Sequence, residues 1–254
     1  MLATCLAVCM HYIAISDQPL KLVWSDEFNY RGHPDPKKWS YEVGLIRNKE
    51  PQYYTSNRLE NARVENGNLV IEARKEDFKG SKYTSASLIT DGKFQFQYGR
   101  LEVRAKLPGG MGSWPAIWMM GVDRSIVGWP RCGEIDVMEH IAYEPQRIYS
   151  TVHQIGVDGT GHVSNGKTLD VSDPTEGFHV YALDWTPRSL EFSVDDKKFF
   201  TFPYQGPAHW TFDSPMYLLI NLAVGGAWAG RNGIDDRSFP QQYLIDYVRV
   251  YQRK

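Results

Sequence analysis

The feature that most constrains the fold of this chain is a rhythm of short apolar runs separated by turn signals, with little helical periodicity. Residues 100–107 alternate strictly between polar and apolar, as expected of a strand with one face in water. Residues 216–224 are almost continuously apolar, which is typical of a strand buried on both faces. Asn66 and Gly67 form a hairpin-type turn signal. On the order of a dozen such strands predict an all-β fold, most simply a β-sandwich.

No composition shift, linker or internal repeat divides residues 21–254, which we therefore predict to form a single domain. Residues 1–20 differ from the rest because residues 1–15 are largely apolar, begin without Lys or Arg, and are too short to span a membrane. This segment resembles the apolar part of a secretory signal, and an irregular extension is the competing interpretation. We favour export, to a secreted, periplasmic or cell-surface location. Leu2 to Cys5 loosely resembles a lipoprotein cleavage site, although Thr4 is a poor residue before the cysteine.

Charge and cysteine content argue against several classes of protein. The formal net charge of -2 gives no reason to expect a nucleic acid partner. Three cysteines are neither a disulfide framework nor a metal site. Cys132 is better explained as a small buried thiol than as a nucleophile, since no His or Asn pattern accompanies it. The chain contains no phosphate-binding glycine loop, zinc motif or nucleophile elbow, and nothing in it requires more than a monomer.

The most unusual stretch places three carboxylates within six residues, at Glu134, Asp136 and Glu139. Side chains on a strand alternate between two faces, so Glu134 and Asp136 share one face and the apolar residue between them faces a core. Glu139 is one residue out of step. A β-bulge at Val137 and Met138 would return it to the carboxylate face. Acids that share a face repel one another, and paired carboxylates are the groups that cleave glycosidic bonds. The stretch therefore indicates a glycosidase.

With these residues in view, the chain resembles glycoside hydrolase family 16, and within it the bacterial laminarinases, which are endo-1,3-β-glucanases. The resemblance covers about residues 22–252 and centres on residues 129–139. Flanking motifs match in the same order, at residues 24–28, 53–55, 60–61, 114–119, 151–153, 225–228 and 245–251. It implies a β-jelly roll of two curved antiparallel sheets, with an open cleft across the concave sheet. Arg131 and Cys132 replace the small residues usual before Gly133, which would reshape one rim of the cleft.

The resemblance also implies a retaining mechanism, with Glu134 as nucleophile and Glu139 as general acid/base. Asp136 is expected to hold the hydrogen bonding of the nucleophile and to tune its charge. The extra residue before Glu139 is typical of laminarinases, agarases and carrageenases rather than lichenases. A retaining pair needs carboxyl groups about 5–5.5 Å apart, so the two glutamates must lean toward each other. The clustered negative charge predicts a raised pKa for Glu139.

Further site residues follow from the resemblance, each with a structural alternative. Asn61 would donate to sugar hydroxyls or be a turn residue. His153 would hydrogen-bond near the cleavage point or be a satisfied core histidine. Four tryptophans match positions that face the cleft, where they would stack on sugars or else pack in the core: Trp114, Trp118, Trp129 and Trp228.

Members of this family often carry one structural calcium far from the chemistry, and none is needed for catalysis. The matching groups are Glu27, the Gly67 carbonyl and Asp246, whose hard oxygen atoms suit Ca²⁺. Ordinary surface hydrogen bonds of the two acids are the alternative.

We therefore expect an endo-acting hydrolase of β-1,3-glucan (laminarin type) or mixed-linkage β-glucan, with a polysaccharide as its partner. One alternative is an agarase- or carrageenase-like galactan hydrolase. A sulfated substrate would favour a basic cleft, and no dense Lys/Arg cluster occurs in the cleft segments. The other alternative is a non-catalytic β-glucan-recognition domain. Such proteins typically lose the acids that this chain retains.

Overall fold

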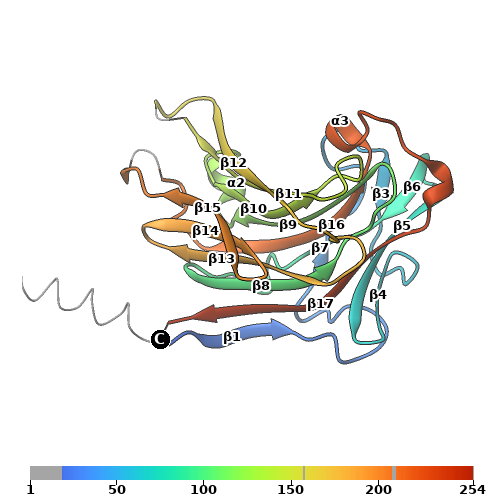
Figure 1. The fold of residues 1–254 in the computed structure, drawn as a ribbon, viewed down its shortest axis with the longest axis horizontal. Coiled ribbons are helices and arrows are strands. Elements are labelled where there is room, and N and C mark those ends of the chain that lie inside the picture. The colour runs from blue at the N-terminus through green and yellow to red at the C-terminus, as the bar shows by residue number, and fades with distance from the viewer. Residues whose placement is uncertain (1–18, 157, 208–209, 254) are drawn as a thin grey trace, which may run out of the picture.

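The protein consists of two sheets packed face to face (Figure 1), in a computed structural model that describes residues 19–253 apart from 157 and 208–209. This confirms the predicted all-β jelly-roll sandwich. Within the described residues, all strand pairs are antiparallel except the last pair of the larger sheet, at residues 52–54 and 81–85, which is parallel. In spatial order, the seven-stranded sheet contains β12 (His162–Asp170), β11 (Arg147–Ile155), β10 (Glu134–His140), β9 (Ser113–Gly121), β16 (Met216–Val224), β7 (Ser87–Ile89) and β2 (Ser40–Tyr41).

The ten-stranded sheet forms the opposite layer. Its main path runs through β15 (Lys197–Pro203), β14 (Ser189–Val194), β13 (His179–Thr186), β8 (Gly99–Lys106), β17 (Gln241–Gln252), β5 (Asn68–Phe78), β6 (Ser81–Ser85) and β3 (Gln52–Tyr54). Beside this path, β1 (Lys21–Asp26) pairs with β17, and β4 (Ala62–Glu65) pairs with β5. The helices of the described residues are short: α2 (Arg124–Val127), α3 (Gly226–Ala229) and the 3₁₀ turn η2 (Asp236–Ser238).

The hydrophobic core lies between the two sheets and follows the patterns that the sequence predicts. On β8, Leu101, Val103 and Ala105 are fully buried, whereas the residues between them are partly exposed, as alternation requires. Every residue of β16 is buried, which confirms that this strand is covered on both faces. Because the ten-stranded sheet covers the inner face, the chemistry-bearing side chains gather on the outer face of the seven-stranded sheet.

Strand β10 carries the predicted bulge. Asp136 pairs with Trp118 of β9, yet the next pair joins Met138 to Ile117, so two steps on β10 match one on β9. The same shift occurs against β11. Val137 and Met138 both enter the core, at 3% and 0% exposure. The extra residue therefore returns Glu139 to the outer face without moving a charge into the core.

The strands of both sheets lie within residues 21–252. The predicted signal-like segment falls almost wholly within residues 1–18, outside the described residues, and its export role stays a prediction. In the described part of the chain, no helix is long and apolar enough to cross a membrane.

Candidate active site

A cleft of about 590 Å³ opens over the middle strands of the seven-stranded sheet. It brings together most of the predicted site residues: Trp114, Trp118, Trp129, Glu134, Asp136, Glu139, His153 and Trp228. The structure adds residues that the sequence did not single out: Arg47, Asn48, Met120, Arg124, Tyr149, Thr151 and His162. At the floor, a smaller space of about 50 Å³ lies against all three carboxylates.

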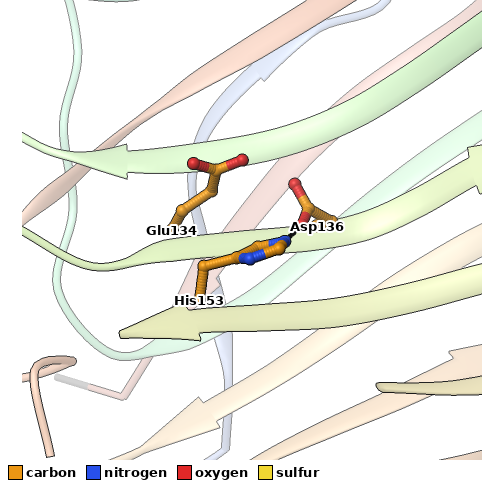
Figure 2. A group of neighbouring side chains, drawn as sticks. All are labelled: Glu134, Asp136 and His153. Carbon is orange, nitrogen blue, oxygen red and sulfur yellow. Dashed lines mark ion pairs between the residues drawn. The ribbon is translucent and has the colours of Figure 1, made fainter. Parts of the chain in front are cut away.

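Glu134 stands at the start of β10, opposite Met120 on one neighbouring strand and His153 on the other. Its carboxylate oxygen Oε2 accepts a hydrogen bond of 2.6 Å from the indole Nε1 of Trp129. This bond orients the carboxylate and leaves the other oxygen for a substrate atom. Figure 2 shows Glu134 beside Asp136 and His153.

Asp136 is the most buried of the three acids, with 4% of its surface exposed. Burial raises the pKa of Asp136 well above its ordinary value, and the charge of Glu134 and a hydrogen bond with Glu134 raise it further. A protonated Asp136 can therefore donate to the Glu134 carboxylate. On its other side, Asp136 Oδ2 lies 2.9 Å from His153 Nε2 (Figure 2).

Glu139 comes after the bulge, opposite Ala116 of β9 and Tyr149 of β11. Burial raises the pKa of Glu139 well above its ordinary value, and the negative charge of Asp136 adds to the rise. Trp114 Nε1 donates a 3.1 Å hydrogen bond to Glu139 Oε1, and this bond lowers the pKa of Glu139. The predicted direction is confirmed, with burial rather than clustered charge as the first cause. A carboxyl group in this state is suited to donate a proton.

His162 is a cleft residue that the sequence reasoning missed. Its Nε2 atom lies 2.8 Å from Nδ1 of His153, and the two rings stack at 5.0 Å. Trp129 packs against His162 with ring centroids 4.6 Å apart. The residues meet because His162 begins β12 opposite Ile155 of β11, two positions beyond His153 and so on the same face. Only strand register brings them together, which explains why sequence spacing gave no signal.

The four predicted tryptophans line the cleft but differ in how much of each ring is free. Trp129 is 46% exposed and can stack on a sugar. Trp118 is only 6% exposed, and the guanidinium of Arg47 lies over its ring at 4.9 Å. Trp114 and Trp228 meet edge to face at 5.3 Å. Trp129 is therefore the strongest candidate for stacking, whereas Trp118 shapes the wall of the cleft.

The prediction that Asn61 contacts a sugar is wrong. Asn61 is fully buried, and its amide nitrogen donates to the Glu72 carbonyl and to Thr84 Oγ1. Its oxygen accepts from Thr55 and Arg58. With donor and acceptor both engaged inside the protein, Asn61 fastens the turn before β4, as its alternative interpretation proposed.

The predicted calcium ligands lie at one corner of the ten-stranded sheet, but their carboxylates already have cationic partners. Both oxygens of Glu27 accept from Arg249, at 3.0 and 2.7 Å, and Asp246 pairs with Arg104 at 2.6 Å. Calcium bound there would have to displace Arg249 from Glu27. Calcium therefore stays a prediction: a chelator should lower the melting temperature if the ion replaces this pair. An unchanged melting temperature would leave arginine as the partner of Glu27.

Away from the predicted calcium ligands, one group of described residues has ligand atoms close enough to one another to hold a metal ion. Glu134, Asp136 and His153 place one ligand atom each within 4.8 Å of one another. The contacts above already account for this cluster, since Asp136 contacts both Glu134 and His153. Nearby, Cys132 is 1% exposed, and burial raises the pKa of its thiol to about 11, as expected of an inert buried cysteine.

Comparison with known proteins finds close relatives across nearly the whole chain. The family model for glycosyl hydrolases family 16 matches residues 49–249. A β-glucanase from Rhodothermus marinus is 48% identical over 244 residues, covering 91% of this chain and 85% of that protein. The structure of the Rhodothermus marinus laminarinase superposes with a TM-score of 0.87 at 46% identity, covering 93% of this chain and 98% of that one.

A third similar protein shows a ligand. A mutant of SCLam, a non-specific endo-β-1,3(4)-glucanase, was co-crystallised with 1,3-β-D-cellotriosyl-glucose and presents 1,3-β-D-cellobiosyl-glucose at its active site. It superposes with a TM-score of 0.85 at 46% identity, covering 92% of this chain and 96% of that one.

The state of Asp136 predicts how one substitution changes stability with pH. Its raised pKa means that the folded protein holds this proton above the ordinary value of 3.8, so the carboxyl costs stability as pH rises through its folded pKa. Asn cannot ionise. The melting temperature of Asp136→Asn, relative to wild type, should therefore increase from about pH 4 toward about pH 7. Asp91→Asn, at an exposed turn, is the control. A difference for Asp136→Asn that does not change with pH would contradict this.

Proposed function

The chain belongs to glycosyl hydrolase family 16, and we propose that it is an endo-acting, retaining hydrolase of β-1,3-glucan (laminarin type) or mixed-linkage β-glucan. The observation that carries this proposal is the set of three carboxylates on one face of β10, in a cleft bounded by tryptophans. Proteins similar to it in sequence and fold include glucanases, and one of these holds a glucan oligosaccharide. The substrate is accordingly a polysaccharide, and no cofactor enters the chemistry.

The first step forms a bond to Glu134. Its carboxylate attacks the anomeric carbon while Glu139 gives its proton to the departing sugar oxygen, so that the glycosidic bond breaks and a glycosyl-enzyme forms. The raised pKa of Glu139 keeps the required proton in place at the start. Trp114, which donates to Glu139, also stabilises the carboxylate that remains after the proton has left.

The second step reverses these roles. Ionised Glu139 takes a proton from water, the water oxygen attacks the anomeric carbon, and the bond to Glu134 breaks. The protonated Asp136 supports both steps because it can donate to Glu134 whenever that carboxylate is free. His153 contacts the carboxyl group of Asp136, and Trp129 donates a hydrogen bond to Glu134.

The two rival functions fit the cleft less well. A recognition domain would need neither a Glu139 whose raised pKa lets it hold a proton nor a Glu134 held by the indole of Trp129. A carrageenan hydrolase must accommodate sulfate groups, and of the two arginines in the cleft lining, Arg47 and Arg124, the first is already paired with Glu42. Sulfated galactan is therefore disfavoured on charge, whereas neutral agarose is separated from glucan only by assay.

Release of reducing ends from laminarin, lichenan, agarose and carrageenan tests the proposal. Cleavage of laminarin or lichenan is expected. Glu134→Gln should abolish turnover because no nucleophile remains, and Glu139→Gln should lower it by about 10²- to 10⁴-fold because no proton is delivered. Both variants should remain folded, with one cooperative melting transition, and Glu60→Gln, at a 56% exposed carboxylate, is the matched control.

Cleavage of agarose or carrageenan alone would identify the enzyme as a galactan hydrolase. Laminarin binding without cleavage would favour the recognition domain. Near-normal activity in either glutamate variant would reject the assigned roles.

A further inference from the structure

Arg47 occupies an unexpected place in the cleft. It lies in the loop between β2 and β3, far from the acid strand in sequence, yet it lines the cleft and also the small space at its floor. That space is bounded by Glu134, Asp136 and Glu139 as well. A neutral glucan carries no charge for a cation to balance. Charge neutralisation of the substrate therefore does not explain why Arg47 lines the same space as the three acids.

The guanidinium of Arg47 is fixed from two sides. Its Nη2 atom forms a close ion pair with Glu42, which in turn accepts a 2.7 Å hydrogen bond from Ser87. Its plane lies over the Trp118 ring, 4.9 Å from the centroid. Stacking of a planar cation on an aromatic ring suits arginine rather than lysine. The side chain is therefore held in one orientation before any substrate arrives.

Its aromatic platform is fixed as well. Trp118 Nε1 donates a 2.7 Å hydrogen bond to Asn221 Oδ1, and Asn221 donates to the hydroxyl of Tyr54 at 3.0 Å. The loop that carries Arg47 is tied to α3 by a 3.1 Å bond from the Ala227 amide to the Asn48 carbonyl. These contacts hold Trp118 and the loop that carries Arg47 in place at the cleft.

One donor of this anchored group is unused. Nη1 of Arg47 is buried and has no hydrogen-bond partner among the described residues. Leaving a buried donor unsatisfied costs stability, and more so when the group is charged. The small space that Arg47 helps to line, about 50 Å³, exceeds the roughly 10–15 Å³ that one water-sized group requires. A hydroxyl group can therefore enter the space that Arg47 helps to enclose.

We propose that Arg47 is a specificity-determining residue, whose guanidinium donates a hydrogen bond to a hydroxyl oxygen of the glucose unit bound on the Trp118 side of the acids. This inference rests on the proposed glucanase function and deepens it. The acceptor is a neutral hydroxyl rather than a sulfate or carboxylate, because Glu42 already balances the charge of Arg47 and the Glu134 carboxylate repels anions.

The test compares Arg47→Met and Arg47→Lys with wild type. Met keeps an apolar stem against Trp118 and removes every donor, whereas Lys keeps the charge and loses the planar fork. For laminarin oligosaccharides, both variants should raise KM by about 10- to 100-fold, the range for losing a charge-assisted hydrogen bond, with much less change in kcat. Calorimetric titration in a Glu134→Gln background should show the same weakening of binding without cleavage.

Two further variants keep this test decisive. Arg188→Met removes an arginine that lies over Tyr204 at 4.8 Å outside the cleft, and it should leave KM unchanged. The double variant Glu42→Gln/Arg47→Met removes both charges together and serves if the single variant fails to fold. Unchanged KM and binding in a folded Arg47 variant would overturn the inference and leave the glucanase proposal standing. A wild type that neither cleaves nor binds these oligosaccharides would overturn both.

Discussion

The active site depends on a single extra residue in β10. Plain alternation would place Glu134 and Asp136 in the cleft and turn Glu139 toward the core, where an ionised carboxylate is very costly. The bulge lets Val137 and Met138 both enter the core and returns Glu139 to the outer face. Burial between the sheets stabilises this arrangement, since the apolar residues of β10 pack against the opposite layer. Packing of the core thus determines which face each acid occupies.

Once the acids share a face, their neighbours give them different roles. Glu134 is held by an indole N–H, Asp136 is buried beside His153, and Glu139 is partly buried after the bulge. Desolvation raises the pKa of Asp136 and Glu139, so that Asp136 can donate a hydrogen bond to Glu134 and Glu139 can protonate the departing sugar oxygen. Two flanks extend from this centre across the strands. One carries Trp129 with the paired histidines of β11 and β12, and the other carries Trp118 with Arg47.

The sequence was sufficient for the fold class, the bulge and the three acids, because alternation and local spacing determine all of them. It was not sufficient for residues whose place depends on long-range register. His162 reaches the site only because β12 pairs with β11, and Arg47 because its loop folds back over β9. Asn61 shows the converse, since a motif match placed it in the cleft whereas its hydrogen bonds hold it inside the protein. Side-chain burial cannot be inferred from a motif alone.

The central claim is that the bulge brings Glu134 and Glu139 together as a retaining pair, and the stereochemistry of the first product tests it most directly. Proton NMR during early hydrolysis of a laminarin oligosaccharide identifies the anomer released before mutarotation. Carboxyl groups at the retaining separation of about 5–5.5 Å act by double displacement and release the β anomer first. Initial release of the α anomer would mean direct attack by water across a wider gap. That result would contradict the role of Glu134 as nucleophile.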